Sequence, residues 1–254
     1  MITYPDSHGR TISELCLLAG KIILQSGGET QRVEDTMTRI AAANGFPKSQ
    51  CYVTPTGLFF DLGGANPFTR YVRISERSTD LSKVTLVNEV SRKISLGELN
   101  AEDALARLQH IERARVVYPA WLQIASAAVA SGCFLIMFKG GWSDFVPAML
   151  AGGIGFALLL LLHRLVQIRF FAEFLSATII GALAIAFVHT GFGHELDRII
   201  IGSVMPLVPG LLITNAVRDL MAGHLVSGLS KGADALLTAS AIGAGIAVML
   251  SAWS

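Results

Sequence analysis

The stretch MPLVPGLLITNAVRDLMAG, residues 205–223, lies in the most apolar half of the chain, yet it carries two prolines, Asn215, Arg218 and Asp219. A helix that only anchors a protein in a membrane needs none of these polar or helix-breaking residues. The stretch therefore raises two questions on which the fold depends. One is whether this half of the chain consists of membrane spans, and the other is whether one span is broken.

The composition favours a membrane protein. Of the 254 residues, 52% are hydrophobic and only 15% are charged, whereas soluble proteins carry about 25% charged residues. The charges are concentrated in residues 1–115 and become sparse beyond Val116. We therefore expect a soluble cytoplasmic domain of residues 1–115 and a transmembrane transport domain of residues 116–254. The net charge of +1 gives no indication of a nucleic-acid partner.

The second domain contains five apolar segments joined by short loops. Each is close to the roughly 20 residues that cross the hydrocarbon of a bilayer. The segments are residues 119–138, 145–162, 170–190, 199–221 and 233–252. Glycines in the second segment (152, 153 and 155) and in the fifth (243 and 245) are expected to allow close helix packing.

The first domain shows the patterns of a small α+β fold. Helical spacing of apolar residues predicts helices over 11–26, from Glu29 to about 45, over 80–95, and from Asn100 to Arg113. Short segments rich in aromatic and β-branched residues between 50 and 75 predict a three-stranded sheet. The predicted fold is thus an α-helical membrane protein with five transmembrane helices, preceded by a small α+β domain.

The distribution of cations predicts the orientation. With the N-terminal domain in the cytoplasm, two cations, Lys139 and Arg198, lie at outer ends of the spans. Six lie at cytoplasmic ends: Arg113, Arg115, Arg164, Arg169, Arg218 and Lys231. This favours a multi-pass protein with its N-terminus inside and its C-terminus outside. With an odd number of spans, a second five-span unit that continued the chain would run inverted, and transport sites commonly form between inverted repeats. The chain is therefore expected to be half of a transporter.

Residues 199–221 are expected to form a broken span. Pro209 lies about 15 Å into it at 1.5 Å per residue, near the middle of the bilayer. Pro206 and Pro209 lack an amide donor, and Gly210 adds backbone freedom. A break here would present the N-terminus of the following helix, which attracts anions. A substrate carboxylate is the predicted guest.

Polar residues follow the break at helical spacing. Thr214 and Arg218 share one face, and Asn215 and Asp219 share the next. Alternatively, Arg218 is an interfacial anchor paired with Asp219, and the prolines are simple kinks. Asp219 and Glu173 are candidates for proton coupling, although Glu173 could instead pair with Arg169. The predicted substrate-binding residues are Pro206, Pro209, Gly210, Thr214, Asn215, Arg218 and Asp219.

Three segments resemble the threonine/serine exporter family, ThrE: GGETQRVEDTMTRIAAANG (27–45), TPTGLFF (54–60) and MPLVPGLLITNAVRDLMAGHLVSGL (205–229). The resemblance covers nearly the whole chain. Full-length members have ten spans, so this chain is similar to the half-length YjjP-type members. The resemblance implies export of threonine and serine, or of a dicarboxylate such as succinate, across the plasma (inner) membrane. It also implies a partner, a YjjB-type five-span membrane protein, and a homo-oligomer is the alternative.

The resemblance also draws attention to a group of residues in the N-terminal domain. It could support a hydrolase, or a regulatory scaffold, but Glu29 and Thr30 could also cap a helix, and Arg32 could pair with its neighbours. The sequence has no nucleophile elbow and no phosphate-binding loop, so we expect no catalytic residue, cofactor or metal, and no drive by ATP. The residues of this group are Glu29, Thr30, Arg32, Glu34, Thr54, Thr56 and Gly57.

Overall fold

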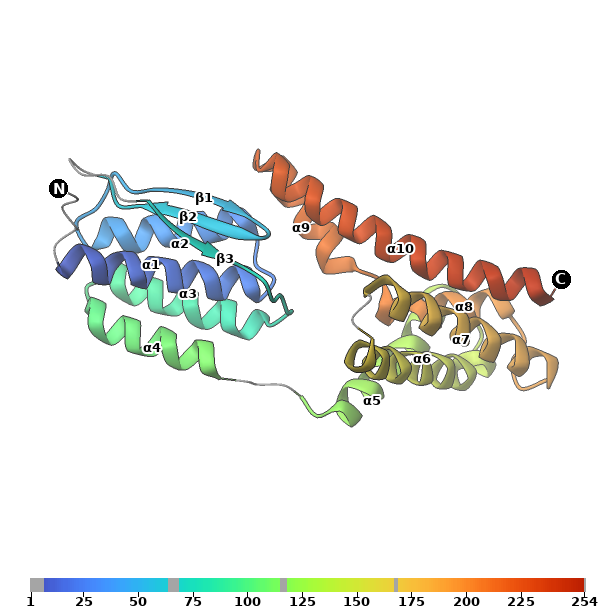
Figure 1. The fold of residues 1–254 in the computed structure, drawn as a ribbon. Coiled ribbons are helices and arrows are strands. Elements are labelled where there is room, and N and C mark those ends of the chain that lie inside the picture. Colours follow the sequence, from blue (N-terminus) through green and yellow to red (C-terminus); the bar gives the residue numbers. More distant parts are fainter. Residues whose placement is uncertain (1–6, 64–68, 115–117, 167–168, 254) are drawn as a thin grey trace. The chain divides into compact units, whose positions relative to one another are not determined.

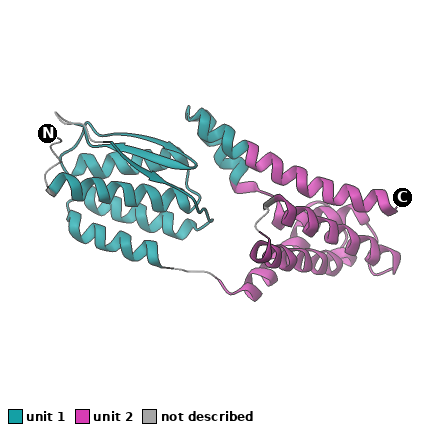
Figure 2. Cartoon of the chain, in the orientation of Figure 1, with its two compact units in different colours: residues 1–115, 212–232 teal, residues 116–211, 233–254 magenta. Residues whose placement is uncertain are grey.

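The structure is a computed structural model, and it describes residues 7–63, 69–114, 118–166 and 169–253. The chain forms two compact units, which Figure 2 shows in different colours. Unit 1 comprises residues 1–115 and 212–232, and unit 2 comprises residues 116–211 and 233–254. Residues 212–232, from the apolar half of the sequence, thus belong to the same unit as the N-terminal residues.

The described N-terminal part of unit 1 contains four helices and a three-stranded sheet, close to the positions that the sequence pattern predicts. In Figure 1 the sheet covers α1 and α2, and α3 and α4 lie beyond α1. The helices are α1 (Ser7–Gln25), α2 (Thr30–Ala43), α3 (Leu81–Ser95) and α4 (Ala101–Arg113), and the strands are β1 (Gln50–Thr54), β2 (Gly57–Asp61) and β3 (Arg70–Arg73).

The core of unit 1 lies between the sheet and the helices. The sheet is antiparallel in the order β1-β2-β3, with Leu58 of β2 opposite both Val53 and Val72. Leu58 is fully buried, while Phe59, the next residue, is 41% exposed, as expected for side chains that alternate between the faces of a strand. One face of the sheet therefore packs onto the core. The apolar faces of α1 and α2, which include Leu15 and Met37, form the other side of this core.

A glycine pair connects α1 to α2. Gly27 has a φ of +83°, a left-handed conformation that favours glycine. A Cβ on Gly28 would lie 2.4 Å from Cγ2 of Ile23, so this position has no room for a side chain. The two glycines end α1 where the sequence predicts and bring the chain directly into the first turn of α2.

Unit 2 is helical. It contains α5 (Ala120–Met137), the short η1 (Trp142–Asp144), α6 (Phe145–Leu165), α7 (Arg169–His189), α8 (Leu196–Val204), the short η2 (Met205–Leu207), and the larger part of α10 (Leu225–Trp253). Gly152 packs against Ser131 and Gly245 against the carbonyl of Phe174, and a Cβ at either glycine would lie within 2.4 Å of them.

The glycines of unit 2 follow the predicted pattern, with one exception. Gly153 and Gly155 also lie against neighbouring helices, as expected for small residues at helix interfaces. The prediction is wrong for Gly243, because no described atom lies within 4 Å of the position of its missing Cβ.

Four described helices are long and apolar enough to cross a membrane: Ala120–Met137, Trp142–Leu165, Phe170–His189 and Leu225–Trp253. A fifth candidate is the pair Leu196–Leu207 and Gly210–Met221, which is bent by 63°. The last helix begins at Leu225, although the apolar pattern predicts a start at residue 233. Its 29 residues correspond to about 43 Å, which exceeds the roughly 30 Å of hydrocarbon in a bilayer.

Candidate functional site

The break in the fourth apolar segment lies at Pro209. The η2 turn ends at Leu207, and α9 (Gly210–Met221) begins directly after the proline. The Val208 amide donates to the Met205 carbonyl at 3.2 Å, which closes the turn. Neither Pro206 nor Pro209 can donate to a helical ladder, so the helix stops and restarts with a bend of 63°. The predicted interruption is confirmed.

Helix α9 buries polar residues and exposes apolar ones. Asn215 is 7% exposed and Asp219 is 1% exposed, whereas Ile213 is 45% and Val217 is 50% exposed. A helix on the surface of a soluble protein shows the opposite arrangement. The polar face of α9 packs within unit 1, and its apolar face has the character of a surface that contacts lipid or another apolar partner.

The Asp219 carboxylate binds the first residue of α2. One oxygen, Oδ1, accepts a hydrogen bond from the Thr30 backbone amide at 3.0 Å, and Oδ2 accepts one from the Thr30 hydroxyl at 2.9 Å. The N-cap residue, Glu29, makes no capping hydrogen bond with its own side chain. Asp219 thus caps the N-terminus of α2, although it lies 189 residues away in the sequence. The helix dipole favours a negative charge at this end of the helix.

Lys231 completes this group. Its Nζ lies 2.7 Å from Oδ2 of Asp219, and both side chains are buried. Nζ also lies 3.4 Å from the Gly28 carbonyl and 3.5 Å from the Thr30 hydroxyl. A buried charge is tolerated when it is paired and hydrogen-bonded. We call Thr30, Asp219 and Lys231 the buried triad.

Three further contacts connect residues 212–232 with the N-terminal part of unit 1. Asn215 Nδ2 donates to the Gly27 carbonyl at 2.9 Å, and Ser227 Oγ donates to the Val53 carbonyl at 3.3 Å. Arg218 forms an ion pair with Glu29. The structure therefore brings together members of the two sets that the sequence analysis treats as separate, the residues below the break and the N-terminal group.

A second acidic residue lies beside the buried triad. Oε1 of Glu34 accepts a hydrogen bond from the Val53 amide at 3.2 Å and lies 3.8 Å from Nδ1 of His224. Burial raises the pKa of Glu34 above its ordinary value, and His224 and the Val53 amide oppose this change only in part. Burial, with Glu34 nearby, raises the pKa of Cys51 to about 12, which keeps its thiol protonated and unreactive.

Thr54, Thr56 and Gly57 form the turn between β1 and β2. The Thr54 hydroxyl donates to the Gly57 carbonyl at 3.1 Å, and the Thr56 carbonyl accepts from the Ile74 amide at 2.9 Å. A Cβ at Gly57 would lie 2.7 Å from the Tyr71 ring. These contacts give the three residues a structural role in the sheet, and the described contacts do not connect them with the buried triad.

Glu173 lies in unit 2, near the start of α7. It is 7% exposed, and its Oε1 lies 3.3 Å from Nε2 of His163 at the end of α6. Its other oxygen has no hydrogen-bond partner among the described residues. The sequence analysis considers Arg169 as the partner, but the Arg169 side chain lies outside the described part of the chain. Glu173 is thus a buried carboxylate, and one of its two oxygens has no hydrogen-bond partner among the described residues.

The sequence analysis missed three residues of the site. The sequence analysis uses Lys231 only as a cation that supports the predicted orientation, and it does not name His224 or Ser227 as site residues. One pattern could have identified Lys231, because it is the only cation in the 29 residues of α10, and a charge in an apolar membrane helix is almost always paired. Asp234, three residues away, offers a local partner, so the pattern would not have identified Asp219. Metal binding has no support in the described ranges, which contain no group of three or more potential ligands.

Comparison with known families decides which class of protein this is. A family model described as "Putative threonine/serine exporter" (ThrE) matches residues 14–253. The chain belongs to the ThrE family. The family description names an exporter, and relatives that match nearly all of this chain are named as a transporter subunit and an exporter, so this ThrE chain is a membrane transporter protein and not an enzyme.

Three relatives indicate the kind of ThrE protein. The chain is 27% identical to a "Probable succinate transporter subunit YjjP" of Klebsiella aerogenes, over 97% of this chain and 96% of the relative. It is also 27% identical to the protein of that name in Escherichia coli, over 96% and 95% of the two chains. A "Probable threonine/serine exporter" of Mycobacterium tuberculosis is 24% identical over 96% of this chain but only 47% of its own length. No solved structure matches the chain significantly.

Proposed function

We propose that this ThrE protein is one subunit of a secondary transporter that exports small carboxylate-bearing metabolites, either serine and threonine or a dicarboxylate such as succinate. The observation that carries the proposal is the break at Pro209, because it interrupts an apolar segment and begins a new helix whose polar face is buried. The names of the relatives, which include both an amino-acid exporter and a succinate transporter subunit, agree with this substrate class.

The proposed substrate site lies at the N-terminus of α9. The first turn of a helix carries part of a positive charge, so the N-terminal end of α9 suits a carboxylate. The Gly210 amide itself donates to the Val208 carbonyl at 2.8 Å, so the attraction comes from the dipole of the whole first turn. Pro206, Pro209 and Gly210 create the opening, and Thr214 and Asn215 follow it on α9. The site is thus made mainly from backbone dipoles, which do not distinguish an amino acid from a dicarboxylate.

Arg218 and Asp219 are proposed to act as exchangeable ligands. In the structure Arg218 pairs with Glu29, and Asp219 lies within the buried triad. A substrate carboxylate would compete with Glu29 for Arg218, and a proton on Asp219 would weaken its ion pair with Lys231. Glu173, one oxygen of which is buried without a partner among the described residues, is the second candidate for proton coupling. In this proposal unit 1 is a gating domain, whose conformation changes during the transport cycle.

A partner subunit is proposed to supply the other half of the pathway. Five spans leave the two ends of a chain on opposite sides of the membrane, so a second five-span protein can be arranged as an inverted repeat. A YjjB-type membrane protein is the proposed partner, and a second copy of this chain is the alternative. The name "transporter subunit" in two relatives supports a multi-subunit assembly.

Reconstitution tests this function. Purified protein is placed in vesicles with and without a five-span partner, and efflux of labelled serine, threonine and succinate is compared. We expect efflux of at least one of these only with the partner, and Pro209→Ala should reduce it about tenfold or more, because restoring an amide donor allows the helix to close. Pro147→Ala is the matched control, since Pro147 lies in the first turn of α6, where proline is tolerated. Equal efflux by the Pro209 variant would exclude the proposed site.

A further inference from the structure

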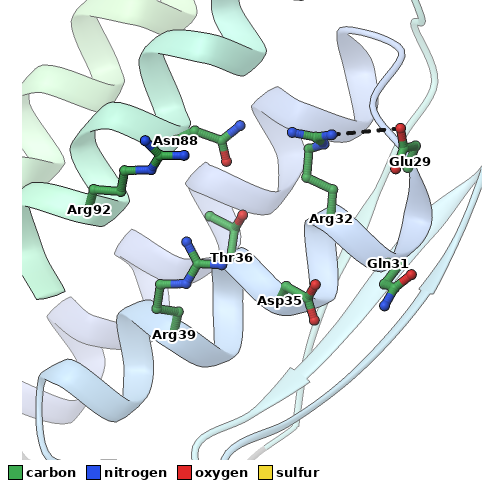
Figure 3. Close-up of a pocket in the computed structure, with 8 residues that line it drawn as sticks. All are labelled: Glu29, Gln31, Arg32, Asp35, Thr36, Arg39, Asn88 and Arg92. Atoms are coloured by element: carbon green, nitrogen blue, oxygen red, sulfur yellow. Dashed lines mark ion pairs between the residues drawn. The ribbon is translucent and has the colours of Figure 1, made fainter.

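A second polar site lies in unit 1, on the side of α2 that faces α3. It is a pocket of about 330 Å³ lined by eight residues, all of them polar. Pockets for small ligands start at about this size, but most are lined mainly by apolar side chains. Figure 3 shows the side chains that line it. We call it the arginine pocket, after Arg32, Arg39 and Arg92.

Helix periodicity explains how the pocket forms. Arg32, Thr36 and Arg39 lie four and three residues apart on one face of α2, and Asn88 and Arg92 lie four apart on α3. Each stripe borders the buried apolar face of its own helix, and α2 packs against α3. The packing of the two helices thus brings the two polar stripes together without placing them in the core.

The pocket contains donors that have no partner. Arg39 and Arg92 make no hydrogen bond or ion pair with any described residue, and Arg32 has only a 3.7 Å contact with Glu29. Thr36 is 1% exposed, and its hydroxyl, too, lacks a partner within the described ranges. In Figure 3 this hydroxyl points into the hollow between Arg39 and Asn88. Although the Thr36 residue as a whole is buried, its hydroxyl oxygen is not among the fully buried side-chain atoms without a partner, so it can donate to a molecule in the pocket.

We infer that the arginine pocket binds a small dicarboxylate. Guanidinium groups donate paired hydrogen bonds to planar carboxylates. Arg32 and Arg39 lie seven residues apart, or about 10 Å along α2, and Arg92 approaches from α3 on the side of Arg39. One carboxylate can bind between Arg39 and Arg92 and another at Arg32, whereas a single compact anion reaches only one end.

The ligand would be sensed at α9. Arg32 and Arg218 both pair with Oε1 of Glu29. A carboxylate that binds Arg32 would weaken the ion pair between Arg32 and Glu29, and this would change the contact between Glu29 and Arg218 of α9. The binding site itself is independent of transport. Its assignment as a sensor of the exported solute rests on the proposed function.

Direct binding tests the inference. The full-length protein in detergent is titrated calorimetrically with succinate, with inorganic phosphate and with acetate. We expect succinate to bind most tightly. The double variant Arg39→Gln/Arg92→Gln should weaken it about tenfold or more, because two charge-assisted contacts are lost. The control Arg10→Gln/Arg73→Gln removes the same charge from exposed positions elsewhere in unit 1 and should leave the affinity unchanged.

A variant that is expected to strengthen binding shows that the changes in affinity do not result from misfolding. Asp35 lines the pocket as an anion, so Asp35→Asn should strengthen succinate binding several-fold, which a damaged protein would not do. The inference is overturned if succinate does not bind in the millimolar range, if phosphate binds more tightly, or if the Arg39/Arg92 variant keeps its affinity. Pro209→Ala separates the two proposals, because it should reduce efflux about tenfold or more and leave this titration unchanged.

Discussion

At the scale of single residues, the buried triad joins residues 212–232 to the N-terminal part of unit 1. Asp219 and Lys231 are 1% and 6% exposed, so neither charge is solvated by water. Such a pair contributes little compared with apolar residues of the same size, but removing one partner leaves an uncompensated charge. Single and double substitutions should therefore behave very differently.

The first prediction concerns this pair. Lys231→Met should destabilise the protein by about 3–5 kcal/mol, the typical cost of breaking a buried ion pair. Lys231→Met/Asp219→Asn should be less destabilising than the sum of its single substitutions, because the residues are in contact. Thermal unfolding in detergent measures both. Lys93→Met, which removes an exposed cation paired with Glu89, should leave the melting temperature unchanged, and additive effects of the triad variants would contradict the prediction.

The second prediction concerns Glu34. Its pKa in the folded protein is raised above 4.5 by burial, with smaller contributions from Asp35 and Asp219, against His224 and the Val53 amide. The folded state therefore keeps the proton to a higher pH than the unfolded state. The stability that Glu34 contributes is present below about pH 4.5 and is lost as the pH rises through the folded pKa.

Glu34→Gln removes this titration and keeps an oxygen for the Val53 amide. The melting temperature of the variant relative to the natural protein should rise with pH above about 4.5 and then level off. Parallel pH profiles of the two proteins, or a difference that falls with rising pH, would contradict the raised pKa. The measurement needs only the purified chain and a series of buffers.

At the scale of elements, the outlines of the helices and strands could be predicted from sequence, and their long-range contacts could not. The Gly27–Gly28 pair, Pro209 and Asn100 determine the ends of elements through local geometry. Asn100 caps α4 because its side-chain oxygen accepts a hydrogen bond from the Asp103 amide at 2.8 Å. In contrast, the contact between Thr30 and Asp219 joins residues that are 189 positions apart. The periodic pattern of apolar residues does not indicate which residues of two distant segments are in contact. The start of α10 at Leu225 was missed for a similar reason, because Lys231 resembles a boundary until its partner is known.

The third prediction concerns α9. Its apolar face should contact lipid, since Ile213 and Val217 are exposed while Asn215 and Asp219 are buried. In a Cys133→Ala background, a fluorophore on Val217→Cys should be quenched by a lipid-soluble quencher and not by a water-soluble one. The remaining cysteines should not react, because Cys16 is buried and the pKa of Cys51 is raised to about 12.

A matched label on Glu102→Cys in α4 provides the control. Glu102 is exposed in the N-terminal part of unit 1, and we expect the reverse quenching pattern there. Quenching of the α9 label by the water-soluble reagent would show that this helix lies in solvent, and the fourth apolar segment would then not be a span.

At the scale of the whole molecule, the number of spans determines where the ends lie. Four helices qualify as spans, and the bent pair makes five if it is counted as one. Two cations that support the predicted orientation, Arg218 and Lys231, have acidic partners within unit 1, so they are less available as interfacial anchors. The orientation then depends more on the remaining cations of the loops.

The fourth prediction is the topology. With five spans, a reporter at the N-terminus should be active in the cytoplasm and one at the C-terminus outside. Fusions of alkaline phosphatase and of a fluorescent protein to each end measure this in intact cells. A C-terminus inside would leave an even number of spans and would remove the reason to expect an inverted partner.

The distance in sequence between Thr30 and Asp219 also has a consequence for biosynthesis. The N-terminal helices leave the ribosome early, but α2 lacks its capping carboxylate until residue 219 has been made, and that carboxylate lacks its cation until residue 231. The fold of the N-terminal part is therefore completed only after residue 231 has been translated. Most of the apolar segments have reached the bilayer by then. A nascent chain that stalls before this point would present an amino-terminal fold without the capping carboxylate of α2 and its paired cation.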